Sequence, residues 1–326
     1  MEAVTGKKEP KERGNRKSSR FWRTFLQQKY LYMMSLPFVI WVFVFSYVPL
    51  WGWTMAFQKY KPMPTASLWD RVFDQKWVGF DQFQRLFTDD QFYLVLRNTL
   101  AMSFMGLIAG FVVPIVFAVL LNEVKNIAFK RVAQTISYLP HFVSWVVVAG
   151  IVIKMLSTDN GAVNDLLMWL GIIDEPYQFM AKEKWFWGIV TAADVWKETG
   201  WNTIIYLAAM AGISSELYEA ARVDGASRLR QIWHITLPGI RSTIVILLIM
   251  SIGHLVSIGF EKQFLLSNNL VSDYAQVLDL YALQYGLQMS NFSYGTAINV
   301  FNSVVGIILL FSANGIFKKI TKESIM

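Results

Sequence analysis

Six apolar stretches, each long enough to cross a bilayer, limit this chain to a membrane fold. A helix needs about 20 apolar residues to cross the hydrocarbon core. Five of the stretches contain no Lys, Arg, Asp or Glu, and only the fourth carries charges. The sequence therefore predicts an all-α membrane protein with six transmembrane helices. They cover about residues 31–57, 99–121, 132–153, 185–213, 242–260 and 294–317.

The composition agrees with a membrane protein and excludes several kinds of chemistry. Charged residues make up 16% of the chain, whereas soluble domains contain about 25%. Because the chain has no cysteine, it can form neither a disulfide nor a thiolate metal site, and it has no cysteine nucleophile. The histidines and carboxylates lack metal-ligand spacing, and no serine, histidine and acid set indicates hydrolysis. We therefore expect neither metal ligands nor catalytic residues.

Basic residues predict how the six helices are oriented. Nine Lys and Arg lie in residues 1–30, and basic loops favour the cytoplasmic side. With six spans, 19 of the 30 Lys and Arg fall in the predicted cytoplasmic parts. We expect both termini in the cytoplasm and an interfacial helix over residues 21–30. The first apolar stretch is too long for a cleaved signal peptide, and basic residues beside a span indicate orientation or anionic lipid rather than nucleic-acid binding.

The cytoplasmic loop over residues 214–241 carries helix signals of its own. Ser214 or the serine after it can cap a first helix, and Gly225 suits the left-handed residue that ends it. Ser227 can cap a second short helix, which Pro238 would break ahead of the next span. The mixed apolar and charged surface indicates a protein partner, while a loop lying on lipid headgroups remains the alternative.

Within this loop, the stretch EAARVDGASRLRQIWHITLP resembles the EAA signature of permease subunits of bacterial ABC importers. That signature reads E-A-A-x-x-x-G and, after nine further residues, I-x-L-P. The neighbouring VDGA is typical of the branch that imports maltose and other oligosaccharides. Ser214 departs from that branch, which often has proline there. The residues implied in coupling to an ATPase are Glu219, Ala220, Ala221, Asp224, Gly225, Ile235, Leu237 and Pro238.

The resemblance implies a type I ABC importer permease fold for residues 31–326, with a cytoplasmic coupling helix that docks on a separate ATPase. The chain itself has no G-x-x-x-x-G-K-[ST] loop to hold nucleotide phosphates. We therefore expect no cofactor on this chain, with ATP and Mg bound by the partner. The implied partners are a second homologous permease, in a heterodimer or homodimer, two ATP-binding subunits, an extracytoplasmic solute-binding protein, an oligosaccharide and the bacterial inner membrane.

The fourth apolar stretch contains charges that are costly inside a membrane, at about 2.5–3.5 kcal/mol each near a helix centre. Asp194, Lys197 and Glu198 are spaced i, i+3, i+4, and Trp201 follows at i+7, so they share one helix face. This stripe predicts a transport pathway, and a buried Asp194–Lys197 ion pair between helices is the alternative. Together with positions that the resemblance adds, the predicted pathway residues are Asp194, Trp196, Lys197, Glu198, Trp201, Ser251 and His254.

The residue types along this pathway suggest an acidic oligosaccharide. Trp196 and Trp201 could stack on sugar faces, while Lys197 and His254 supply cationic groups that a neutral sugar would not need. The chain most resembles the longer permeases for polysaccharide-derived oligomers, an alginate importer among them. His141 is interpreted as a packing or hydrogen-bonding residue rather than a ligand.

Two other functional classes fit a polar membrane chain. A proton-coupled secondary transporter could use Asp194 or Glu198 as its proton-binding group. A membrane-embedded enzyme or signalling scaffold is the second alternative. Neither class needs the helix, glycine corner and helix of the cytoplasmic loop.

Overall fold

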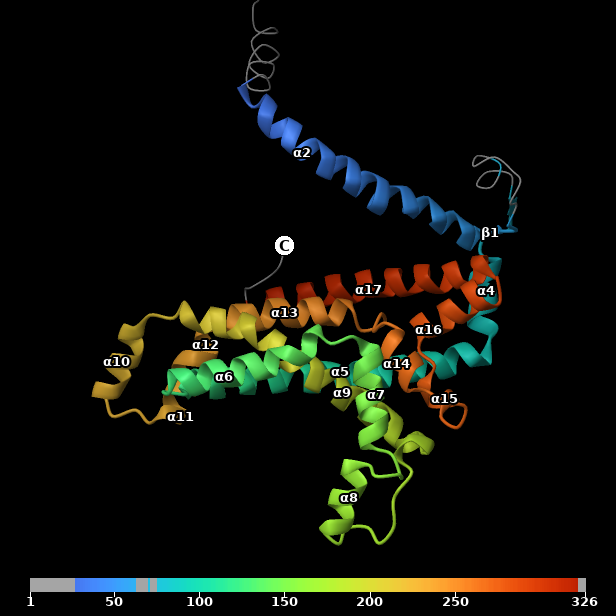
Figure 1. Cartoon of the computed structure of the whole chain (residues 1–326). Coiled ribbons are helices and arrows are strands. Elements are labelled where there is room, and N and C mark those ends of the chain that lie inside the picture. The colour runs from blue at the N-terminus through green and yellow to red at the C-terminus, as the bar shows by residue number, and fades with distance from the viewer. Residues whose placement is uncertain (1–26, 63–69, 71–74, 322–326) are drawn as a thin grey trace, which may run out of the picture. The chain divides into compact units, whose positions relative to one another are not determined.

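The computed structural model describes residues 27–62, 70 and 75–321 (Figure 1). The basic N-terminus up to residue 26, with residues 21–26 of the predicted interfacial helix, lies outside these residues. The chain divides into two units, Met1–Thr54 and Met55–Met326. The described part is helical except for loops and one antiparallel pair of two-residue strands, β1 (Gln58–Lys59) and β2 (Lys76–Trp77).

The first unit contains most of one apolar helix that runs from Lys29 to Phe57. The helix changes from α-helical to wider π-helical turns just before Pro49, and then to tighter 3₁₀ turns. Proline lacks an N–H, and its ring would clash with the carbonyl four residues earlier. A wide π-helical turn over that carbonyl gives the ring room. The segments are α2 (Lys29–Val42), the π-helix η1 (Phe43–Tyr47) and the 3₁₀-helix η2 (Val48–Phe57).

The second unit is built around three long helices, α5 (Asp90–Glu123), α9 (Glu183–Ala211) and α17 (Phe292–Thr321). By length and composition, Lys29–Phe57, α5 and Phe292–Lys319 are able to cross a membrane, and two bent helix pairs could each form one further span. The fourth predicted span corresponds to α9, which carries charges along its middle. Six spans therefore stay a prediction.

The span predicted over residues 132–153 is not one continuous helix. The chain forms α6 (Ile127–Tyr138), a 3₁₀ turn η3 (Leu139–Phe142) and α7 (Trp145–Met155). The two helical parts meet at 105°. Pro140 occupies the first turn of η3, where its missing N–H costs least, and Ser144 is extended with ψ of 152°. Hydropathy cannot detect a break that contains no charged residue.

The predicted helix over residues 242–260 is also shorter than expected. α13 (Arg241–Gly253) ends at His254, and the chain then runs irregularly to Gly259, whose φ is +77°. The remaining elements around these helices are α4 (Asp81–Thr88), α8 (Ala162–Trp169), η4 (Phe179–Ala181), α14 (Glu261–Leu266), α15 (Ser272–Ala275), α16 (Leu278–Leu283) and η6 (Gln284–Gln288).

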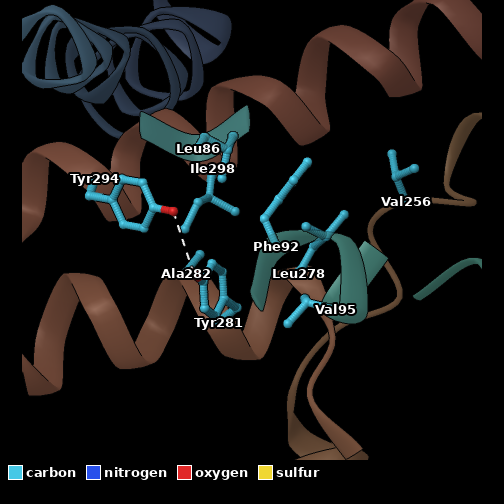
Figure 2. Close-up of a cluster of buried hydrophobic side chains, with 9 residues drawn as sticks. All are labelled: Leu86, Phe92, Val95, Val256, Leu278, Tyr281, Ala282, Tyr294 and Ile298. Carbon is cyan, nitrogen blue, oxygen red and sulfur yellow. Dashed lines mark hydrogen bonds between the residues drawn. The ribbon is translucent and has the colours of Figure 1, made fainter. Parts of the chain in front are cut away.

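One carboxylate joins three helices of a buried apolar cluster. Asp89 caps α5 by accepting a hydrogen bond from the Gln91 backbone N–H at 3.0 Å. It also accepts hydrogen bonds from the hydroxyls of Tyr281 at 2.6 Å and Tyr294 at 3.0 Å. Apolar side chains from α4, α5, α16 and α17 surround the two tyrosines (Figure 2). These contacts hold the starts of α5 and α17 and the helix α16 together.

At the middle of the unit, α9 makes a backbone contact with α6. A Cβ atom added at Gly200 would lie 1.9 Å from the Ser137 carbonyl oxygen, closer than any side chain can approach. On another side of α9, the Thr203 hydroxyl donates to the Pro114 carbonyl of α5 at 3.2 Å. These contacts place the charged part of α9 between α5 and α6.

We expect Gly200→Ala to lower the melting temperature of the detergent-solubilised protein by several degrees. Alanine favours helix over glycine by about 1 kcal/mol, but here its Cβ would force α6 and α9 apart. Gly188→Ala is the matched control, because it lies on the same helix with no atom within 4 Å of an added Cβ. If Gly200→Ala melted at or above the temperature of the unmodified protein, as Gly188→Ala is expected to, the close approach would be contradicted.

Candidate functional site

A cavity of about 440 Å³ lies among α5, α9, α13 and α14. Small and apolar residues of α5, such as Gly106 and Gly110, form one wall, and α9 forms the opposite wall. The irregular segment after α13 and the start of α14 complete the lining. Its polar members are Ser103, Thr191, Asp194, Glu198, Thr199, Asn202, Ser251, His254, Ser257, Lys262 and Gln263.

Four of the seven predicted pathway residues line this cavity, namely Asp194, Glu198, Ser251 and His254. The face of α9 that lines it contains Thr191, Asp194, Glu198 and Asn202. This periodicity of three and four residues matches a helical face, turned slightly away from the predicted stripe. Trp196, Lys197 and Trp201 are not among the lining residues.

The alternative to the pathway, an Asp194–Lys197 ion pair, is not the pairing that forms. Asp194 instead pairs with Lys262 of α14, with 2.8 Å between Oδ2 and Nζ. Lys197 is buried and pairs with Glu198 at 3.1 Å. Its Nζ also donates to the His141 carbonyl oxygen at 2.7 Å. Two carboxylates are therefore balanced by two ammonium groups, which offsets the cost of placing ionised groups on this helix.

His141 belongs to the same network, where it both hydrogen-bonds and packs. Its Nδ1 lies 2.7 Å from Glu198 Oε2, and its ring stacks on Trp201 with 4.5 Å between centroids and an interplanar angle of 3°. Trp201 thus orients the histidine behind the cavity wall. Trp196 is half exposed, away from the cavity lining. The bend at Ser144 brings His141 here, and no periodic pattern in the sequence shows that bend.

Sequence reasoning missed Lys262 and Gln263. The polar triplet that opens α14 directly follows the fifth apolar stretch, and this was the available signal. Their approach to α9 depends on the irregular segment, which Asp279 holds by accepting a hydrogen bond from the Gly259 N–H at 2.7 Å. Burial raises the pKa of Asp279, and the hydrogen bonds that it accepts oppose this shift.

The loop over residues 214–241 has the predicted helix, glycine corner and helix. Ser214 caps α10 (Ser215–Val223), and its hydroxyl accepts a hydrogen bond from the Glu216 N–H at 3.3 Å. Gly225 turns the chain with φ of +74°. Ser227 caps α11 (Arg228–Gln231) in the same way.

The predicted break at Pro238 is displaced. The helix continues through the π-helix η5 (Ile232–Thr236) and α12 (Leu237–Gly239), and bends by 61° only after Gly239. As at Pro49, a wide turn precedes the proline and accommodates its ring. The bend therefore follows the proline instead of preceding it.

The loop is anchored at its base and exposed at its tip. The hydroxyls of Tyr218 and Thr236 lie 2.9 Å apart and join its two helices, and Arg228 lies 3.8 Å from Glu123 at the end of α5. Val223 is 88% exposed beside the corner. Of the residues implied in coupling, Ala221, Ile235 and Leu237 are half-buried, while Glu219, Ala220, Asp224, Gly225 and Pro238 are exposed.

Residues 103–322 match the family described as binding-protein-dependent transport system inner membrane component. The match covers more than half of the chain, including the cavity and the loop. This chain belongs to that family.

Similar proteins extend the match to nearly the whole permease. The polygalacturonan/rhamnogalacturonan transport system permease protein YteP of Bacillus subtilis (strain 168) is 44% identical over 325 residues, covering 100% of this chain and 97% of that relative. A chain in the crystal structure of a bacterial ABC transporter involved in import of the acidic polysaccharide alginate has a TM-score of 0.83 and 39% identity. The alignment covers 93% of this chain and 99% of the matched chain. A second such structure, in complex with alginate pentasaccharide-bound periplasmic protein, has a TM-score of 0.84 and 38% identity over 94% of this chain and 100% of that chain.

The permease is therefore a transport subunit of an ABC importer for sugars or oligosaccharides, with the type I fold. It is a multi-pass protein of the inner membrane. ATP hydrolysis belongs to separate subunits in such systems. Family membership decides against the secondary transporter, enzyme and scaffold alternatives.

Glu198→Gln should destabilise the permease by about 3 kcal/mol, because it leaves the buried Lys197 ammonium without its carboxylate. Adding Lys197→Met should restore part of that loss by removing the unpaired charge. Thermal unfolding in detergent measures both effects. Glu183→Gln, at the exposed start of α9, is the control and should change little. A double variant that is less stable than Glu198→Gln alone would refute the pairing.

Proposed function

We propose that this permease imports oligosaccharides that contain uronic acid units. The observation that carries the proposal is the similarity, along almost the full chain, to a permease named for polygalacturonan and rhamnogalacturonan and to one in an importer of acidic alginate. Galacturonan and alginate differ in their sugars but share carboxylates. The charged lining of the cavity, with Lys262 among its members, supports an acidic substrate.

In this proposal the permease pairs with a second permease and two ATPase subunits, and it receives sugar from an extracytoplasmic solute-binding protein. The ATPases hold ATP and Mg. Their closure moves the exposed corner at Gly225, and the anchored base of the loop transmits that movement to α5 and α13. The termini and the loop lie in the cytoplasm, and the sugar passes along the cavity between Asp194, Glu198 and His254.

The substrate class is tested by uptake in cells of the source bacterium with and without this chain. We expect cells that contain it to take up radiolabelled galacturonate or alginate oligomers of three to five sugars, and deletion to abolish that uptake. Neutral arabino-oligosaccharides of equal length are the control and should enter at a similar rate in both strains. Uptake of acidic oligomers that does not depend on the chain would refute the proposal.

Gly225→Pro should abolish uptake while leaving membrane insertion intact. Proline requires φ near −65°, which is incompatible with the +74° at this corner. Gly225→Asn is the matched control and should retain most uptake, since asparagine tolerates the left-handed region.

Glu219→Lys, on the exposed face of α10, should also abolish uptake, because it reverses the charge that faces the ATPase in this proposal. Substrate-stimulated ATP hydrolysis in membrane vesicles distinguishes lost coupling from lost binding. Normal uptake by Gly225→Pro would exclude the coupling role.

A further inference from the structure

Two neighbouring residues on α14 present unfilled hydrogen-bonding groups at the cavity. Lys262 and Gln263 both line it. The Gln263 side chain is fully buried, and neither its Oε1 nor its Nε2 has a hydrogen-bond partner among the described residues. A buried amide without partners costs about 1–3 kcal/mol, so the folded chain carries this cost unless something in the cavity bonds to the amide.

Lys262 is the cavity's accessible ammonium group. Its side chain is 16% exposed, and its Nζ bonds to Asp194 Oδ2 at 2.8 Å. The same Nζ lies 5.9 Å from the Trp145 ring centroid. An ammonium has three donors, and the geometry assigns only one of them to Asp194. Lys197, by contrast, is held behind the wall by Glu198 and the His141 carbonyl.

The position of α14 is fixed by apolar packing rather than by these polar groups. Leu266 is buried at the end of the helix against Phe186 and Val190 of α9. The preceding segment is held by Asp279 through the Gly259 N–H. Lys262 and Gln263 therefore lie on a helix that Leu266 and the preceding segment hold in place, and neither side chain is needed for that.

We propose that Lys262 and Gln263 form the recognition pair for the carboxylate of a uronate unit in the cavity. The Lys262 ammonium and the Gln263 amide donate to the carboxylate oxygens, and Gln263 Oε1 accepts from a hydroxyl of the same sugar. Asp194 is the competing anion that occupies Lys262 before the sugar arrives. This inference rests on the proposed function and names the residues that give it selectivity.

The competition predicts opposite effects for the two members of the ion pair. Lys262→Met removes the cation and should raise the KM for uptake of trigalacturonate about tenfold or more, since charge-assisted hydrogen bonds contribute on that scale. Asp194→Asn removes the competitor and should leave that KM unchanged or lower. If the pair only braced α14 against α9, both variants would raise the KM together.

The matched probe is trigalacturonate with its carboxylates methyl-esterified, which has the same length and linkages without charge. Lys262→Met should change the KM for this ester little, and Lys262→Arg should keep the preference for the acidic form. Gln263→Leu should raise the KM for both probes without lowering the melting temperature, because it breaks no hydrogen bond in the substrate-free protein. Lys184→Met, an exposed lysine outside the cavity, is the control.

These assays use intact cells that express the whole importer, with the amount of permease in membranes measured for each variant. Wild-type cells that fail to import trigalacturonate would refute the proposed function itself. Wild-type import with an unchanged acid-to-ester ratio in Lys262→Met would overturn only the recognition pair. An unchanged KM in Gln263→Leu would remove Gln263 from it.

Discussion

The structure depends on how ionised groups are accommodated along α9. Each charge there would be costly in an apolar setting, and removal of one partner from a buried pair leaves the other uncompensated. Asp194 is balanced from α14, whereas Glu198 is balanced by the adjacent Lys197 and also contacts His141 Nδ1 at 2.7 Å. The second arrangement holds the α6–α7 bend against α9, and the first joins α9 to α14, which Leu266 already packs in place. The cavity wall is therefore a consequence of charge balance as much as of shape.

The two pairs differ in what they leave available. Lys197 is enclosed by a carboxylate, a carbonyl and the Trp145 ring, so its charge is used inside the protein. Lys262 has the same ring on one side but remains in the cavity lining. A protein that needs both stability and an exchangeable contact can separate these tasks between two lysines. The apolar anchor at Leu266 allows the second lysine to change partners without loss of the fold.

Much of this arrangement could be predicted from local patterns. Hydropathy identified the long helices, and capping serines with a glycine between them identified the cytoplasmic loop. The failures involve breaks that carry no charge, at Ser144 and after Gly253, and contacts between residues distant in the sequence. Helical spacing placed Asp194 and Glu198 on one face but could not show that Lys197 turns away from it. The partners His141 and Lys262 become visible only when those breaks fold the chain back.

The backbone contact between Gly200 and Ser137 has a mechanical consequence. Side chains can switch rotamers when two helices slide, but a touching pair of main chains has no such adjustment. At this level the spacing of α6 and α9 is set by the chain itself. A change in the distance between α6 and α9 at this point would require the backbone itself to move.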